Sequence, residues 1–442
     1  MKIQLSDHFN YRKLLRFSFP SIVMMIFTSI YGVVDGFFVS NYVGKTPFAA
    51  VNFIMPFLMI LGAVGFMFGT GGSALIAQAL GEGKPDRAKK IFSLLIYVST
   101  LCGILIAALG ILFLRPIAQF LGAEGVMLEN CVTYGRMILL ALPAFMLQFE
   151  FQSFFVTAEK PQLGLAVTVA AGMTNILLDA LFVAGFQWGL VGAAVATAAS
   201  QLVGGLIPVI YFACPNSSLL RLTKTCFDGS ALLKTCVNGS SELMSNISMS
   251  LVGMLYNVQL MKYAGEDGVA AYGVLMYVNM IFLAAFIGYA VGTAPVVSYH
   301  YGAGDYNELK SLLKKSLVII GIFSVAMLAL GEVLALPLSH IFVGYDQGLL
   351  ELTLKGFVIY SFSFLFAGMA IYGSSFFTAL GDGLTSALIA FLRTLVFQIL
   401  AVLILPLLWG IDGIWVSIVV AELMATVLTI FFLMVKQKKY HY

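Results

Sequence analysis

Two carboxylates lie within stretches of the chain that are otherwise strongly apolar. Asp35 follows Tyr31 by four residues in Tyr-Gly-Val-Val-Asp-Gly-Phe-Phe, and Asp179 follows Asn175 by four in Asn-Ile-Leu-Leu-Asp-Ala-Leu-Phe. Side chains four apart share one face of a helix, so each acid is expected beside a polar partner. Two neighbouring carboxylates in a low-dielectric site resist being ionised together, so such a pair can bind and release a proton. Hydrogen bonding between helices without titration is the alternative interpretation.

Other residues extend this candidate site. Thr197, in Gly-Ala-Ala-Val-Ala-Thr, is placed to add a hydroxyl from a later helix. Asp35, Glu150 and Gln152 are predicted to line a substrate cavity. Pro20 precedes Asp35 on the same predicted helix. Because proline permits a bend, Pro20 is predicted as a hinge, with a static kink as the alternative.

Two further charges fall in apolar stretches near the end of the chain. Arg393 and Glu422 are expected near mid-depth on the last two predicted helices. A structural ion pair is one interpretation of them, and a second charge-bearing site is the other. The chain has five cysteines, whose spacings match neither a disulfide framework nor a metal site. No metal or other cofactor is therefore expected.

The elements that position these residues follow from the composition. Hydrophobic types make up 60% of the 442 residues and charged types only 10%, against about 45–50% and about 25% in soluble domains. Apolar runs long enough to span a bilayer recur along the whole chain, without the alternation typical of an outer-membrane barrel. A polytopic α-helical membrane protein is predicted. The net charge of +3 is too small to indicate nucleic-acid binding.

Apolar blocks separated by glycine, proline and charged residues predict twelve membrane spans. If the N-terminus lies inside, most Lys and Arg residues fall in inner loops, which indicates cytoplasmic termini in a plasma or inner membrane. The outer-loop exceptions are Lys45, Arg115, Lys262 and Lys355, and Arg136 and Arg393 lie within spans. The predicted spans are roughly 14–40, 48–80, 91–114, 127–157, 162–186, 189–213, 235–263, 268–301, 312–337, 348–378, 384–408 and 411–435.

The two halves of the chain repeat each other at a shift of 221 residues. The matched segments are Tyr42-Val-Gly44 with Tyr263-Ala-Gly265, Gly81-Glu-Gly83 with Gly302-Ala-Gly304, and Gly189-Leu-Val-Gly192 with Gly410-Ile-Asp-Gly413. Each half has six predicted spans, so the repeat is parallel and its pseudo-two-fold axis should run along the membrane normal. The predicted fold is all-α, with a lobe at 1–213, a cytoplasmic linker at 214–234 and a second six-helix lobe at 235–442.

The acid pair does not repeat. The shift places Tyr256 under Asp35 and Leu400 under Asp179. Folding of the repeat therefore does not require these carboxylates, which favours a role specific to the first lobe.

The motifs together resemble the MATE (multidrug and toxic compound extrusion) transporters, and among them the bacterial MepA-like exporters. The resemblance covers essentially the whole chain and rests mainly on Asn175-Ile-Leu-Leu-Asp179 followed by Gly189-Leu-Val-Gly-Ala-Ala-Val-Ala-Thr197. It implies an antiporter rather than an enzyme, which exports amphipathic organic cations by alternating access. The coupling site that it implies consists of Asp35, Asp179, Asn175, Tyr31, Thr197 and Tyr134.

The resemblance leaves the coupling ion open between H+ and Na+. The branch called NorM also has acids in its seventh and tenth spans, where this chain has Ser250 and Ala367. This departure favours H+, with Na+ as the alternative. Expected partners are small organic cations and membrane lipid, with no nucleic acid, and a monomer is expected.

Three rival interpretations differ in the site they require. A lipid-linked substrate flippase of the same superfamily should have a basic cavity, to hold pyrophosphate. A major facilitator carrier is the second rival. The loop from Gly81 to Lys90 only half matches the loop motif of those carriers. An intramembrane enzyme is the third rival. Its catalytic Gly-Asp motif is present in Gly381-Asp-Gly, but no second acid is aligned with it.

Overall fold

The computed structural model describes residues 3–442, and their regular elements are helices, with no strand among them. The first lobe consists of α1 (Tyr11–Phe38), α2 (Lys45–Gly81), α3 (Pro85–Phe120), α4 (Gly125–Leu140), α5 (Leu142–Thr157), α6 (Pro161–Asp179) and α7 (Gly189–Ala213). The second consists of α8 (Gly229–Gly302), α9 (Tyr306–Val343), α10 (Gln347–Ser361), α11 (Phe364–Ala379), α12 (Gly383–Phe391), α13 (Phe397–Trp409) and α14 (Ile411–Tyr440). Short π-helical turns occupy Val39–Val43, Ala180–Gly185 and Leu392–Val396.

Helix α8 is a hairpin of two membrane crossings. Its backbone leaves the helical region at Gly265, with φ 66° and ψ −152°. The rings of Tyr256 and Tyr272 stack with centroids 5.4 Å apart, whereas sixteen residues of straight helix would separate them by about 24 Å. The chain therefore reverses direction at Gly265, between the two spans predicted for this region.

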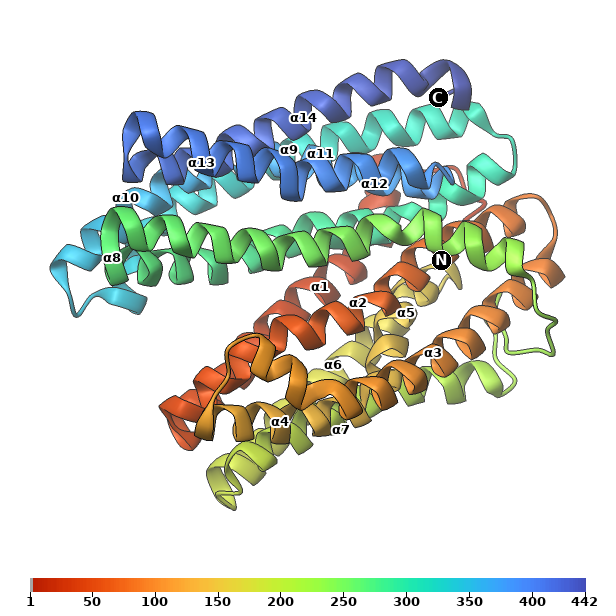
Figure 1. The fold of residues 1–442 in the computed structure, drawn as a ribbon. Coiled ribbons are helices and arrows are strands. Elements are labelled where there is room, and N and C mark those ends of the chain that lie inside the picture. The colour runs from red at the N-terminus through yellow and green to blue at the C-terminus, as the bar shows by residue number, and fades with distance from the viewer. Residues whose placement is uncertain (1–2) are drawn as a thin grey trace.

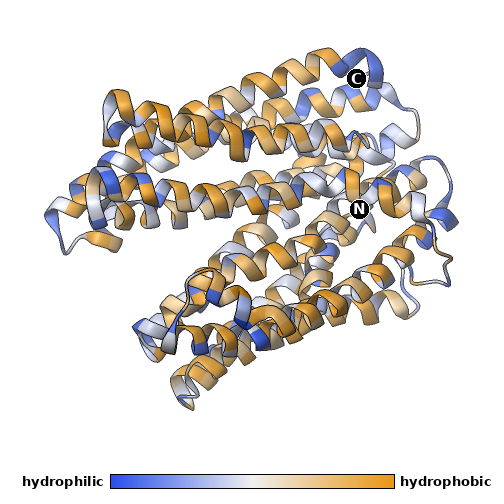
Figure 2. Ribbon diagram, in the orientation of Figure 1, coloured by the Kyte–Doolittle hydropathy of each residue, from blue (hydrophilic) through white to orange (hydrophobic). Residues whose placement is uncertain are grey.

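The spans account for the predicted twelve crossings. Within residues 3–442, nine helices are long and apolar enough to cross a bilayer, or eleven if each bent pair is one span. The bent pairs are α4 with α5 (57°) and α10 with α11 (48°), and each fills one predicted span. Since α8 supplies two crossings, the total is twelve. Figure 2 shows hydrophobic residues along most of the helices and hydrophilic residues concentrated at their ends.

The repeat predicted from the sequence recurs in the backbone. Gly83 and Gly304, which the shift of 221 residues superimposes, have φ values of 73° and 71°. A positive φ at this position is the left-handed conformation that favours glycine. Both loops therefore turn in the same way, as expected of two halves with one topology.

The two lobes approach each other at one end of the molecule and separate toward the other (Figure 1). Both termini lie at the end where the lobes meet, called here the terminal end; the other is the open end. Glycines lie at the contact between the lobes. A Cβ on Gly71 would lie 2.2 Å from the Thr235 carbonyl oxygen, and a Cβ on Gly302 would lie 2.3 Å from the Gln78 carbonyl oxygen. The lobes thus touch backbone to backbone, leaving no room for side chains.

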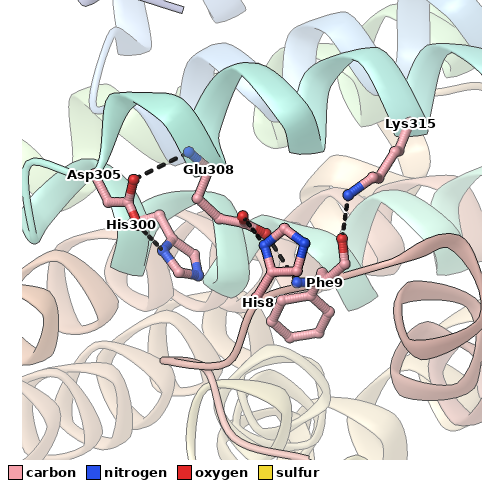
Figure 3. A network of polar contacts seen from close by, with 6 residues as sticks. All are labelled: His8, Phe9, His300, Asp305, Glu308 and Lys315. Atoms are coloured by element: carbon pink, nitrogen blue, oxygen red, sulfur yellow. Dashed lines mark hydrogen bonds and ion pairs between the residues drawn. The ribbon is translucent and has the colours of Figure 1, made fainter.

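The segment before α1 ties the lobes together at the terminal end. The Leu5 N–H donates to Glu159 Oε1 of the first lobe at 2.8 Å, and the Phe9 N–H donates to Glu308 Oε1 of the second at 2.9 Å. Figure 3 shows the Glu308 carboxylate in contact with both His8 and the Phe9 nitrogen, and Lys315 donating to the Phe9 carbonyl. Leu5 and Phe9 are fully buried.

The last helix is fixed to the turn between α11 and α12 by Asp382. Its Oδ1 accepts from the Thr385 N–H at 3.2 Å, and its Oδ2 lies 3.4 Å from Lys436 Nζ of α14. Burial raises the pKa of the Asp382 carboxyl, but hydrogen bonds from Tyr440 and Thr385 and the Lys436 charge outweigh it. The pKa of Asp382 therefore lies below its ordinary value.

Several helices, such as α3 and α9, extend beyond the predicted spans, and α8 extends into the predicted linker. The chain between α7 and α8 is non-helical from Cys214, but α8 begins at Gly229, within the segment predicted as linker. Asp228 caps this start because its side chain accepts from the Ala231 N–H.

Candidate functional site

The first lobe brings the two predicted acids together. Asp35 lies in the last turn of α1, just before the π-helical turn Val39–Val43, and Asp179 ends α6, just before the turn Ala180–Gly185. The two carboxyl groups interact directly. π-Helical turns are uncommon and often occur at functional sites, and here one follows each acid.

Two polar side chains connect the acid pair to α7. Thr197 Oγ1 lies 3.4 Å from Asp35 Oδ1, and Asn175 Nδ2 lies 3.4 Å from the same hydroxyl. Both contacts are long, so each hydrogen bond is weak. Thr197 also has the Ala193 carbonyl as an acceptor at 3.0 Å. The Thr197 hydroxyl is therefore too weak a donor to hold Asp35 permanently ionised.

Both tyrosines expected at the site are present. The Tyr31 hydroxyl is near both Asp35 and the Gln148 side chain. Tyr134, 1% exposed, reaches the Thr197 hydroxyl. The structure thus assembles all six residues of the predicted coupling site from α1, α4, α6 and α7.

The burial of Asp179 determines what this site can do. Asp179 is fully buried, and neither of its oxygens has a well-aligned hydrogen-bond partner among residues 3–442. An ionised carboxylate without compensation costs several kcal/mol in such surroundings. A bound proton or a bound cation removes that cost, so the site is suited to exchanging one for the other.

The residues predicted to line the substrate cavity are distributed over different faces of the lobe. Glu150 is fully buried on the side of α5 that faces Gly69 of α2 and Ser99 of α3. Gln152 is two residues further along α5 and so points to nearly the opposite side. It lines a small cavity with residues of α6 and α7. Whether these side chains contact substrate stays a prediction.

Gln148 is a site residue that the sequence analysis missed. It lies one helical turn before Gln152 on α5, is 4% exposed, and its Oε1 has no hydrogen-bond partner within residues 3–442. Leaving a buried polar group unpaired costs about 1–3 kcal/mol. Considering neutral amides in apolar spans, as well as ionisable groups, would have identified it.

Arg393 and Glu422 form an ion pair in the second lobe. Arg393 Nε donates to Glu422 Oε2 at 2.8 Å, and a terminal guanidinium nitrogen donates to Oε1 at 3.0 Å. This two-point geometry agrees with the ion-pair interpretation. The counterpart of Asp35, Tyr256, donates to Gln398 Oε1 at 2.7 Å.

Pro20 lies in α1 without interrupting it. The helix runs continuously from Tyr11 to Phe38, and Pro20 is buried close to where Gly288 of α8 meets Ser21 and Ile22. The predicted hinge is therefore next to the contact between the lobes. Within residues 3–442, no group of three or more His, Cys, Asp or Glu is arranged to hold a metal ion.

Twelve crossings in two repeated lobes, with a buried ionisable site in one lobe, are typical of a secondary membrane transporter. A family model described as MatE matches residues 20–181 and again residues 243–404. These matches begin and end at corresponding positions of the repeat and cover most of the chain. The chain belongs to the MATE family of transporters.

Several known proteins are similar over nearly the whole length. The multidrug export protein MepA of Staphylococcus saprophyticus is 26% identical, covering 93% of this chain and 91% of that protein. A structure described as the outward-facing conformation of a multidrug resistance MATE family transporter of the MOP superfamily has a TM-score of 0.93 at 22% identity, covering 100% of this chain and 98% of that one. A MOP superfamily transporter from Pyrococcus furiosus, described as having a binding pocket of reverse polarity, has a TM-score of 0.91 at 21% identity, with 98% of each chain covered. The two structural likenesses concern the fold.

Proposed function

We propose that this protein is a multidrug exporter that moves amphipathic organic cations out of the cell in exchange for H+. The observation that carries the proposal is the fully buried Asp179 beside Asp35, without well-aligned donors, in a lobe whose repeat lacks both acids. The relatives described as multidrug export proteins support the export of drugs by this protein.

The terminal end is assigned to the cytoplasm of a plasma or inner membrane. The bias of basic residues supports this orientation. With the lobes in contact at that end, the described conformation is open toward the outside. Alternating access then requires the lobes to separate at the terminal end and close at the open end, with the protein acting as a monomer in lipid.

Cation and proton compete for the same two carboxylates. On the outside, protonation of the pair removes the negative charge that holds a cation, so the drug leaves. On the inside, loss of the proton restores that charge and a new cation binds. Pro20, next to the contact between the lobes, would let α1 bend as Asp35 changes its protonation state. The cargo crosses unchanged, so no enzymatic step is involved.

Na+ is the alternative coupling ion, because the site offers several oxygen ligands. These are the two carboxylates, the side-chain oxygen of Asn175 and the Thr197 hydroxyl. Lipid-linked substrates are the alternative cargo. The Pyrococcus furiosus protein is described as having a binding pocket of reverse polarity that suggests a different function, so the charge of the pocket is relevant to the choice of cargo. The acidic site here, and the pairing of Arg393 with Glu422, favour a cationic cargo.

The test is transport by the purified protein in liposomes. Ethidium movement is followed with an imposed pH gradient, with an imposed Na+ gradient, and with neither. We expect movement with the pH gradient and its loss in Asp35→Asn, while Tyr256→Phe, changed at the corresponding position of the other lobe, stays active. Ethidium movement driven only by the Na+ gradient would show that Na+, and not H+, is the coupling ion. No movement of any organic cation would favour lipid-linked cargo.

A further inference from the structure

The first lobe contains a row of buried amides on the terminal side of the acid pair. Gln148 and Gln152 are one helical turn apart on α5, and each is only 4% exposed. The Gln148 Oε1 has no hydrogen-bond partner within the described residues, and neither does the Oε1 or Nε2 of Gln152. The Gln201 Oε1 on α7 is likewise unpartnered in that part of the chain. Buried polar groups without a partner in the protein usually hydrogen-bond to water or to a ligand.

A small cavity lies against these amides. Gln148 and Gln152 line it together with Thr168 of α6 and Gly204 of α7, and its volume is about 10 Å³. A space of that size holds roughly one water molecule, which needs two to four polar partners. Gly204 makes the close approach of Gln148 feasible, because a Cβ there would lie 2.6 Å from the amide carbon.

The amides are continuous with the acid pair. Tyr31 lies near both groups, since its hydroxyl is close to Asp35 and to the Gln148 side chain. Helix α5 runs toward the terminal end, so Gln152 lies about 6 Å nearer to that end than Gln148. Thr168, on the far side of the cavity, is about 10 Å from where α6 begins. The polar groups thus lead from the acids toward the end assigned to the cytoplasm.

The second lobe has no amide at the positions that correspond to Gln148 and Gln152. Where the repeat aligns Ser153-Phe-Phe with Ser375-Phe-Phe, Gln148 and Gln152 correspond to Ala370 and Ser374. Ser374 Oγ lies 2.9 Å from the Ser386 hydroxyl, so its polar group is paired within the protein. The two glutamines of α5 therefore occur in the lobe that has the acids, and the corresponding positions of the other lobe carry no amide.

We propose that Gln148 and Gln152 hold the water through which the coupling proton travels between the acid pair and the cytoplasm. This inference rests on the proposed H+ coupling. A protonated carboxyl gives its proton to the first water by way of the Tyr31 hydroxyl, each hydrogen bond in the row shifts by one proton, and the last water releases one to the cytoplasm. The amides stay neutral and unchanged, so they are positioning residues.

The described conformation contains room for about one water, so the row is interrupted. The rings of Phe151 and Phe155 also line the cavity. Proton passage then depends on hydration gained when the lobes separate at the terminal end. This arrangement keeps protons from leaking through the first lobe while the outside is open.

The test compares Gln152→Leu and Gln148→Leu with wild type in liposomes containing a pH indicator. Leucine keeps a similar volume and removes the amide. Thr157→Val is the matched control, because it lies on the same helix, is fully buried, and its hydroxyl bonds to the Ser153 carbonyl of its own helix. Proton release, ethidium transport and equilibrium ethidium binding are measured for each protein, and Gln152→Asn tests rescue.

We expect each leucine variant to slow proton release and transport at least tenfold, with ethidium affinity within twofold of wild type and partial rescue by asparagine. Transport and proton release at wild-type rates in both leucine variants would overturn the inference while leaving H+ coupling intact. Loss of ethidium binding would overturn it too, by assigning the amides to the substrate site. If the wild-type protein itself releases no protons, the proposed H+ coupling is refuted, whatever the amides do.

Discussion

Enlarging Gly71 should open the terminal end of the molecule. A Cβ at this position would lie 2.2 Å from the Thr235 carbonyl oxygen and 2.7 Å from the Gly239 nitrogen. These distances are about 1.3 Å and about 0.8 Å shorter than a normal contact of about 3.5 Å, and both partners are backbone atoms that cannot rotate away. Overpacking of this kind costs about 1–3 kcal/mol. The conformation with the lobes in contact at this end should therefore lose about 5–150-fold in population.

The assay is a distance measurement between spin labels at Arg87 and Lys310, which are exposed near the terminal ends of α3 and α9. Gly71→Ala should shift the distance distribution toward longer values. Gly253→Ala is the control, because a Cβ there meets nothing within 4 Å. A Gly71→Ala distribution that matches both the control and wild type would refute the reasoning that backbone contact keeps this end closed.

Three further predictions concern other contacts. Arg393→Met should destabilise the protein by about 3–5 kcal/mol because it leaves Glu422 buried without a partner, and adding Glu422→Leu should restore most of the thermal stability; no recovery would contradict this. Asp382→Asn should lower the unfolding temperature at pH 7. Since the lowered pKa of Asp382 stabilises the folded state only where its carboxyl is ionised, the deficit should disappear as the pH falls below about 4; a deficit that is independent of pH would count against the charge. Glu308→Ala should expose the segment before α1 to proteases, because the buried Phe9 N–H loses its acceptor, and unchanged cleavage would contradict that role.

The fold was largely predictable because the repeat and the apolar spans carry strong signals. Gly83 and Gly304, which match at a shift of 221 residues, have nearly equal φ values of 73° and 71°. The break between α4 and α5 at Ala141 was not predicted. An apolar run shows the length of a span, whereas its bend depends on packing between helices.

The candidate site was predictable where charge made it conspicuous. Asp35 and Asp179 are costly within apolar spans, and their helical spacing predicted the polar partners found beside them. Gln148 and the opposite directions of Glu150 and Gln152 were not predicted. A neutral amide carries a weaker cost in the sequence, and the face of α5 that meets each neighbouring helix is set by tertiary packing.

The central claim is that a cation and a proton compete for one acid pair, and proton release on binding tests it most directly. Ethidium is added to the purified protein in weakly buffered solution, and the released protons are counted with a pH indicator, in wild type and in Asp35→Asn with Asp179→Asn. We predict release of about one proton per bound ethidium in wild type, because the competing species each carry a single charge, and none in the double variant. Ethidium binding to wild type without proton release would contradict the claim.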